Sequence, residues 1–88
     1  MRSKTPDWYV YIVRCGDDSL NTGIARDLEE RIATHNSGAG ARYTRSRLPV
    51  SLVYHEAAVD RSSALRREHT IKQLARTEKL ELIASTAA

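Results

Sequence analysis

The feature that most constrains the fold of this chain is an uninterrupted apolar and aromatic run near its N-terminus, Trp8-Tyr9-Val10-Tyr11-Ile12-Val13. β-Branched and aromatic residues favour strands, and a run without polar alternation is typical of a strand that is covered on both faces. A chain of 88 residues has room for one hydrophobic core. We therefore expect a single domain over residues 8–84 built around this strand, with flexible ends at residues 1–7 and 85–88.

Turn and capping residues divide the rest of the chain into further elements. Gly16-Asp17-Asp18 predicts a turn, and the alternation that follows predicts a hairpin partner over residues 19–24. In this strand Leu20, Thr22 and Ile24 are expected on one face, and Asn21 and Gly23 on the other. Asp27 and Asp60 each precede a segment with helical periodicity. The sequence thus predicts a mixed α/β (α+β) chain in the order strand-strand-helix-strand-helix-helix. The later elements are expected at residues 27–36, 50–55 and 64–75, followed by a short helix after Thr77.

Polar groups occupy positions that should face the sheet. The helix over residues 27–36 carries Arg31 and His35 on its apolar stripe. The later helix is expected to bury Leu65, Ile71 and Leu74, and Glu68 projects from this apolar side. A salt bridge between Arg31 and Glu68 at the rim of the core is one explanation. The other is a site for phosphate chemistry. An arginine matches phosphate oxygens, a lone carboxylate can hold hydrated Mg²⁺, and a tyrosine such as Tyr11 can orient a water molecule.

Positive charge is concentrated in the second half of the chain. The net charge is +3, and residues 41–88 hold nine Lys and Arg against five Asp and Glu. The segment over residues 41–49 contains no acid and is expected to be a mobile basic loop that contacts nucleic-acid phosphates and stacks on a base. Its candidate residues are Arg42, Tyr43, Arg45 and Arg47, to which we add Lys72 from the later helix. The alternative is a solvated loop that serves only solubility.

Cysteine content and hydropathy predict the compartment. The sequence has one cysteine and no apolar stretch long enough to span a membrane. We therefore expect a cytoplasmic protein in which Cys15 is a small apolar filler. The three histidines have no metal-ligand spacing, so no zinc site is expected.

Four short motifs carry a resemblance to a known family. They are Tyr9-Val10-Tyr11, Asn21-Thr22-Gly23, Leu28-Glu29-Glu30-Arg31 and Ala64-Leu65-Arg66-Arg67-Glu68. Over residues 8–84 the chain resembles the GIY-YIG endonuclease superfamily, and more closely its small stand-alone bacterial members. The resemblance implies a three-stranded antiparallel sheet flanked by helices. It also implies cleavage of DNA phosphodiesters with one divalent metal ion, Mg²⁺ or Mn²⁺.

The resemblance also implies roles for individual residues. Glu68 would be the metal ligand, and Arg31 would stabilise charge on the phosphoryl oxygens. Tyr11 would be positioned at the attacking water, and His35 would occupy a position where members place a supporting His or Tyr. Such an arrangement needs no protein nucleophile.

The second motif departs from the family pattern at Asn21, where the family has a tyrosine viewed as the general base or its relay. An amide does not accept a proton at physiological pH, and loss of a general base typically costs about 10²- to 10⁴-fold in rate. Two functions stay open: an impaired metal-dependent DNA endonuclease, and a nucleic-acid-binding module on the same fold that has lost catalysis. A third is an interaction protein whose C-terminal helix docks on a partner.

Overall fold

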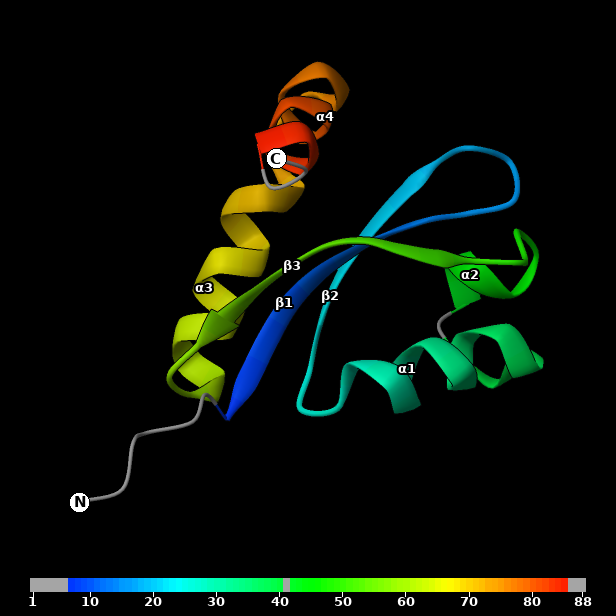
Figure 1. Ribbon diagram of the computed structural model, residues 1–88, viewed down its shortest axis with the longest axis horizontal. Helices are drawn as coiled ribbons and strands as arrows, with labels where there is room; N and C mark the ends of the chain where they lie inside the picture. The colour runs from blue at the N-terminus through cyan, green and yellow to red at the C-terminus, as the bar shows by residue number, and fades with distance from the viewer. Residues whose placement is uncertain (1–6, 41, 86–88) are drawn as a thin grey trace.

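The sheet places the apolar run at its centre. The computed structural model describes residues 7–40 and 42–85 of the 88-residue chain. Three strands, β1 (Trp8–Arg14), β2 (Leu20–Ala25) and β3 (Ser51–Ala58), pair antiparallel in the order β2-β1-β3. β1 is therefore the central strand (Figure 1). Its residues 10–13 are buried. The predicted three-stranded antiparallel sheet is confirmed.

Helical segments flank the strands. They are α1 (Leu28–Thr34), the π-helical turn η1 (His35–Ala39), α2 (Arg42–Arg45), α3 (Arg61–Lys72) and α4 (Arg76–Ser85). Asp27 and Asp60 cap α1 and α3, as predicted. Their carboxylates accept the N–H groups of Glu30 at 3.1 Å and Ser63 at 2.8 Å. The predicted order of strands and helices is confirmed, with η1 and α2 added between α1 and β3.

Several predicted boundaries are wrong. The helix expected over residues 27–36 ends at Thr34, and the chain continues in η1, where Gly38 has a φ of 88° that suits glycine. The loop expected over residues 41–49 contains α2, and its residue 41 lies outside the described residues. β3 extends three residues beyond the predicted strand, to Ala58. α3 begins and ends three residues earlier than predicted, because the Asp60 cap sets its start.

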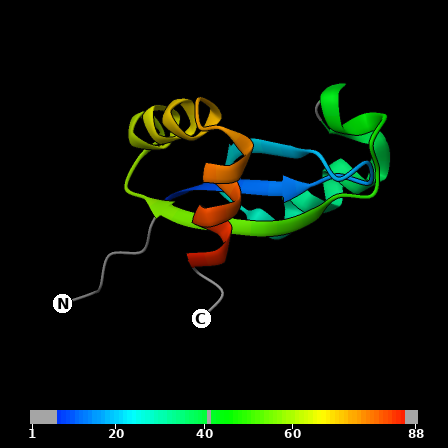
Figure 2. The ribbon, with the colours of Figure 1, turned by 90° about the horizontal axis from the view of Figure 1, so that it is seen from above.

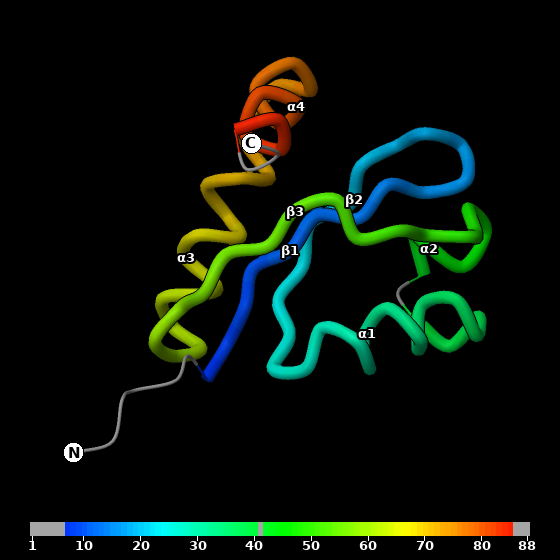
Figure 3. Tube along the Cα trace, in the orientation of Figure 1, coloured from blue at the N-terminus to red at the C-terminus, as the bar shows by residue number. Residues whose placement is uncertain are grey.

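Different helices cover the two faces of the sheet (Figures 1 and 3). On one face, β1 packs against α3 and α4 through Val10, Ile12, Ala64, Ile71, Leu82 and Ile83. On the other face, β1 packs against α1 through Tyr11, Val13, Cys15, Leu28 and Ile32. Figure 2 shows α4 crossing the direction of the strands. Cys15 is buried in the second cluster, as expected for a small apolar filler.

The orientation of α3 decides where Glu68 lies. Ala64 and Ile71 are fully buried, whereas Leu65, which the periodicity placed on the buried side, is 38% exposed, so that prediction is wrong. Arg67 lies on the β3 side of α3, since its Nε donates to the Glu56 carboxylate at 2.8 Å. Because successive helical residues are about 100° apart, Glu68 lies on the opposite flank, toward β2.

The helices are short. α3 has 12 residues, whereas a membrane-spanning helix needs about 20. In the part of the chain that the structure describes, no helix has the length and apolar character needed to cross a membrane.

Asn36 connects η1 to the start of β3. Its side-chain amide donates to the Val50 carbonyl oxygen at 3.1 Å, and its amide oxygen accepts from the Val50 N–H at 2.7 Å. Val50 is buried among the residues under α1. These two bonds therefore close the segment that contains α2 and fix it against the sheet.

We expect Asn36→Ala to lower the free energy of unfolding by about 1–3 kcal/mol, because both backbone groups of buried Val50 lose their partner. Urea unfolding measures this change. Ser37→Ala is the matched control, since among the described residues the Ser37 hydroxyl bonds only to the nearby backbone of Thr34 and Ala39. Equal stability of the two variants would contradict the role given to Asn36.

Candidate functional site

Two buried hydrogen bonds link β1, η1 and α2. The Tyr11 hydroxyl lies 3.1 Å from His35 Nε2, and Nδ1 of the same ring lies 2.7 Å from Thr44 Oγ1. Tyr11, His35 and Thr44 are 3%, 1% and 0% exposed. The three side chains therefore form one polar network inside the protein, between the sheet and the helices on its α1 face.

Two glycines make room for this network. Gly23 pairs with Tyr11 across β1 and β2, and a Cβ at Gly23 would lie 2.5 Å from the Tyr11 hydroxyl oxygen. A Cβ at Gly40 would overlap the imidazole of His35. Because Gly23 has no side chain, the Tyr11 ring lies over β2 and brings its hydroxyl above this edge strand.

Burial controls the protonation of both rings. It raises the pKa of the Tyr11 hydroxyl and lowers the pKa of His35, which the nearby Arg31 charge lowers further. At neutral pH, Tyr11 is therefore a phenol and His35 a neutral imidazole. A neutral imidazole has one donor and one acceptor nitrogen. In the tautomer with Nδ1–H bonded to Thr44, Nε2 is available to accept the Tyr11 proton.

Arg31 and Glu68 flank Tyr11 from two different helices. After burial, the largest effects on the Tyr11 pKa are the Arg31 charge, which lowers it, and the Glu68 charge, which raises it. Both charges are thus close enough to act on one hydroxyl. The fold brings together Tyr11, His35, Arg31 and Glu68, which the sequence placed in one site, where α1, β2 and α3 converge.

Arg31 and Glu68 do not pair with each other. The Glu68 side chain is 18% exposed, and its carboxylate lies 3.2 Å from the Lys72 ammonium group. Within residues 7–40 and 42–85, the Arg31 side chain makes no hydrogen bond or ion pair, and it is exposed at the rim of the sheet rather than packed against it. The explanation of these residues as a salt bridge between Arg31 and Glu68 is therefore wrong.

Asn21 lies next to Tyr11 on the same face of the sheet. β1 and β2 pair Tyr11 with Gly23 and Val13 with Asn21, so Asn21 is the diagonal neighbour of Tyr11. Its side chain is half-buried and, among the described residues, makes no hydrogen bond. The neighbours of Asn21 in the chain point to the opposite face, as the alternation predicted.

The arginines of the basic segment fall into two groups. Arg42 and Arg45 are exposed on α2, and neither side chain has a partner within the described part of the chain. Arg47 is already bound, because its Nε donates to Asp17 at 3.0 Å and its guanidinium carbon lies 3.9 Å from the centroid of the Tyr43 ring. Arg42 and Arg45 are therefore the more available of the predicted phosphate contacts, and Arg47 covers one face of Tyr43.

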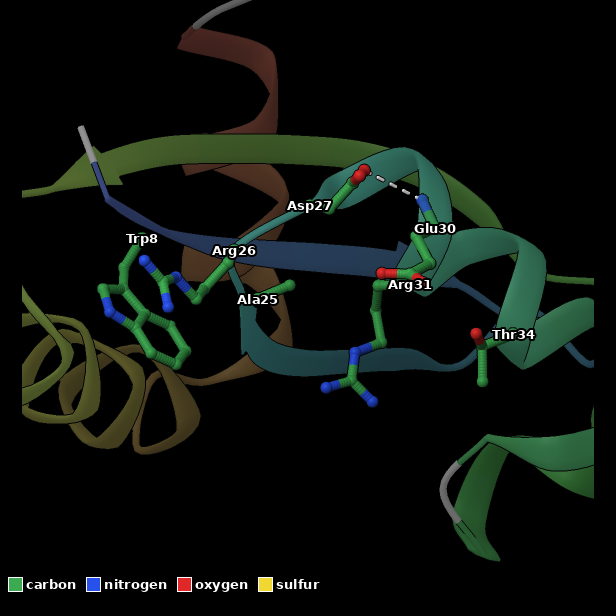
Figure 4. Close-up of a pocket in the computed structure, with 7 residues that line it drawn as sticks. All are labelled: Trp8, Ala25, Arg26, Asp27, Glu30, Arg31 and Thr34. Atoms are coloured by element: carbon green, nitrogen blue, oxygen red, sulfur yellow. Dashed lines mark hydrogen bonds between the residues drawn. The ribbon is translucent and has the colours of Figure 1, made fainter. Parts of the chain in front are cut away.

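A pocket of about 400 Å³ opens beside Arg31 (Figure 4). Its lining residues are Trp8, Ala25, Arg26, Asp27, Glu30, Arg31 and Thr34. The Arg26 guanidinium carbon lies 5.6 Å from the centroid of a Trp8 ring. The pocket therefore combines an aromatic surface with two guanidinium groups.

Sequence reasoning missed three residues of this region. Thr44 carries no local signal, since its contact with His35 forms only when η1 and α2 fold together. Trp8 belongs to the apolar run and was interpreted only as a strand residue. A signal for Arg26 existed: the hairpin register that pairs Tyr9 with Ala25 places residue 26 opposite residue 8.

The side chains at this site fit a hydrated magnesium ion better than a metal ion held by protein alone. Among the described residues, no three His, Cys, Asp or Glu side chains are grouped to hold a metal ion. Mg²⁺ often keeps several waters and is held by one or two carboxylates together with substrate phosphates. Glu68 supplies one such carboxylate. The residues therefore fit a metal ion that the substrate helps to hold.

Comparison with known families agrees with the fold. Residues 7–81 match the family described as the GIY-YIG catalytic domain. The chain belongs to the GIY-YIG family, a family of nucleases that act on nucleic acid. The resemblance inferred from the four motifs is thereby confirmed.

Similar proteins include several of the UPF0213 group. The UPF0213 protein of Desulfotalea psychrophila is 57% identical over 79 residues, which cover 89% of this chain and 72% of the relative. That of Staphylococcus haemolyticus is 55% identical over 75 residues, covering 85% and 92%. The solution NMR structure of the UPF0213 protein from Bacillus halodurans has a TM-score of 0.58 at 42% identity, covering 90% of this chain and 84% of that one. A protein from E. faecalis, also solved by NMR, has a TM-score of 0.59 at 32% identity, covering 100% and 94%.

The buried His35 makes stability depend on pH. Because its pKa is lowered in the folded protein, the unfolded chain binds a proton that the folded chain resists. We expect the free energy of unfolding to be highest above the usual histidine pKa of about 6.5 and to fall as the pH drops below it. Urea unfolding between about pH 7.5 and 5 measures this loss.

His35→Gln should flatten this pH dependence, whereas His69→Gln, at an exposed position, should retain it. Hydrogen bonds from Ser19 and Ser63 lower the pKa values of Asp17 and Asp60. These two carboxylates therefore change the free energy of unfolding only in a more acidic range, near the usual Asp pKa of about 4. NMR titration of the His35 ring in the unaltered protein measures the same property directly. A His35 pKa at or above the usual value would contradict the prediction.

Proposed function

We propose that this protein is a divalent-metal-dependent endonuclease that hydrolyses phosphodiester bonds in DNA. The observation that carries the proposal is the convergence of the Arg31 guanidinium, a carboxylate and a phenol bonded to a neutral imidazole. Family membership supports nuclease chemistry, and the residues suggest how each part of it is performed.

Arg31 binds the scissile phosphate. Its guanidinium is exposed in the pocket and has no partner among the described residues. A guanidinium can make two parallel hydrogen bonds to phosphate oxygens. Negative charge on these oxygens increases as water attacks phosphorus, so Arg31 stabilises the transition state more than the ground state.

Tyr11 and His35 remove the proton from the attacking water. The phenol oxygen accepts the water proton while its own proton passes to His35 Nε2, 3.1 Å away. The lowered pKa of His35 keeps this ring unprotonated and available at neutral pH. Thr44 holds Nδ1 at 2.7 Å and so keeps the ring in line with the Tyr11 hydroxyl.

Glu68, together with the bound phosphate, would hold the divalent ion, Mg²⁺ or Mn²⁺. The ion would supply positive charge beside the phosphate and lower the pKa of a water molecule. Before substrate binds, the Lys72 ammonium group at 3.2 Å balances the charge of Glu68.

Asn21 explains why we expect activity to be low rather than absent. The amide cannot replace the phenol that the family carries in its second motif, but Tyr11 and His35 still provide a hydroxyl and a base. The diagonal position of Asn21 beside Tyr11 means that a phenol there would act on the same reaction centre.

Asn21→Tyr should raise metal-dependent nicking of supercoiled plasmid at least about ten-fold, equivalent to about 1.4 kcal/mol of barrier. The substitution changes only the Tyr11 face of β2, so thermal stability should change little. Glu68→Gln in the Asn21→Tyr background is the control, and it should abolish the added activity. If the double variant nicks DNA as fast as Asn21→Tyr alone, Glu68 does not hold the metal ion.

If no nicking of supercoiled, single-stranded or branched DNA occurs with either metal ion, even after Asn21→Tyr, the proposed activity is wrong. A folded Asn21→Tyr protein that stays as slow as the parent would instead assign proton removal to other groups. Comparison of the parent with Tyr11→Phe, which keeps the ring and removes only the hydroxyl, then tests the role of Tyr11.

A nucleic-acid-binding module without catalysis is the second candidate function. It is favoured by Asn21 and by Arg42 and Arg45 on α2, whose side chains have no partner among the described residues. Arg47, tied to Asp17 at 3.0 Å, adds less to binding than its place in the sequence suggested.

Arg42→Ala combined with Arg45→Ala should reduce the slope of log K against log salt concentration for duplex DNA by about 2. Arg47→Ala removes one positive charge and should reduce it by less than 1, because that charge is already paired. Fluorescence anisotropy over a salt series, without divalent ions, measures both slopes. Equal effects per arginine would contradict the distinction between paired and unpaired side chains.

A further inference from the structure

We infer that the pocket beside Arg31 receives one unstacked nucleobase, with Trp8 as its stacking surface, so that the substrate has an unpaired nucleotide next to the bond that is cut. This inference rests on the proposed function and adds the substrate class to it. It is carried by the size, charge and aromatic content of the pocket.

The pocket has the size of a single nucleotide rather than of a duplex. Its volume of about 400 Å³ lies near the lower end of small-ligand pockets, roughly 300–1,000 Å³. Trp8 and Arg31 both line it, on different sides, as Figure 4 shows, with Ala25 between them. A nucleotide whose phosphate is bound by Arg31 can therefore extend its base toward Trp8.

The charges of the lining favour a neutral group over a second phosphate. Arg26 and Arg31 are matched by Asp27 and Glu30, so the formal charges of the pocket cancel. The unpaired arginines of α2 lie outside this lining and offer a better place for the neighbouring phosphates. The pocket therefore suits an uncharged, flat group with polar edges, and a nucleobase is such a group.

Trp8 and Arg26 provide the surface for stacking. The Trp8 ring packs on the core cluster under α3, which fixes its position, and the Arg26 guanidinium lies 5.6 Å from the ring centroid. Arg26 is exposed and, among the described residues, has no ion pair that would hold it elsewhere. Aromatic rings and arginines together form the stacking surfaces of proteins that bind single strands.

The pocket thereby predicts a preference between substrates. A base in a duplex can reach Trp8 only by leaving its stack and its partner, which costs free energy, whereas an unpaired base pays little. Single strands, bulges and strand junctions should therefore bind better than blunt duplexes. Tyr43, which the sequence suggested for stacking, is already covered on one face by Arg47.

Intrinsic fluorescence tests the inference directly, because Trp8 is the only tryptophan in the sequence. The unaltered protein is titrated, without divalent ions, with a short thymidine oligonucleotide and with an abasic oligonucleotide of the same length and backbone charge. We expect the thymidine oligonucleotide to quench Trp8 emission and the abasic one not to. A fluorescein label on each oligonucleotide reports affinity separately from quenching.

Two pairs of variants separate stacking from charge and from folding. Trp8→Ala should weaken binding of the thymidine oligonucleotide about ten-fold and leave abasic binding unchanged, and Trp8→Phe, which keeps an aromatic ring in the core, should retain most of the affinity. Arg26→Ala and Arg66→Ala each remove one exposed arginine. Only Arg26→Ala should lower the ratio of thymidine to abasic affinity.

Equal quenching by the two oligonucleotides, or equal affinity for single-stranded and blunt duplex DNA, would overturn the inference. Base-dependent quenching without cleavage by any metal ion would support the pocket and reject the proposed nuclease. Cleavage of blunt duplex without quenching would support the nuclease and reject the pocket.

Discussion

The hydrogen bond between the Tyr11 hydroxyl and His35 is the interaction on which the candidate site depends. It joins the central strand to the turn after α1, and Thr44 holds the other side of the imidazole ring. The bond forms only because Gly23 lets the phenol lie over β2 and Gly40 leaves room for the imidazole. Burial then keeps the phenol protonated and the imidazole neutral, which is the pair of states a proton transfer from water requires.

Packing on the opposite face of the sheet completes the site. Ala64 and Ile71 hold α3 against β1, and the contact of Arg67 with Glu56 fixes the rotation of this helix. On its other flank Glu68 comes close enough to Tyr11 to raise its pKa, while Arg31 lowers it from α1. Glu68 and Arg31 belong to helices on opposite faces of the sheet, lie near the edge strand β2 and do not pair with each other. In the proposed function, this separation leaves Arg31 available to a substrate phosphate and Glu68 available to the divalent ion.

Strong local signals made much of the fold predictable. The apolar run favoured a covered strand, and Asp27 indicated the start of α1 because a cap bonds the N–H three residues on. Asp60 was likewise recognised as a helix-start residue, although the helix after it was predicted to begin three residues too late. Features that depend on contacts between distant residues were not predicted. The arginine-rich segment was predicted as a mobile loop, yet it contains α2, because Thr44 is buried and the Arg47 side chain bonds to Asp17 across the molecule. Leu65 was placed in the core because periodicity cannot say how a helix is rotated, whereas its packing on the sheet can.

The sequence by itself determined the family, the order of strands and helices, and the residue types of the site, because the motifs and their spacing are local properties of the chain. It also determined that Asn21 and Gly23 lie on the opposite face from Leu20 and Thr22, since strand alternation has a period of two. Only the tertiary structure decided that Glu68 does not pair with Arg31, and that His35 is held between Tyr11 and Thr44. It also decided that Trp8 and Arg26 share a pocket with Arg31. Each of these contacts joins side chains from different elements or turns, and their distances are set by packing of the whole core, which no local pattern encodes.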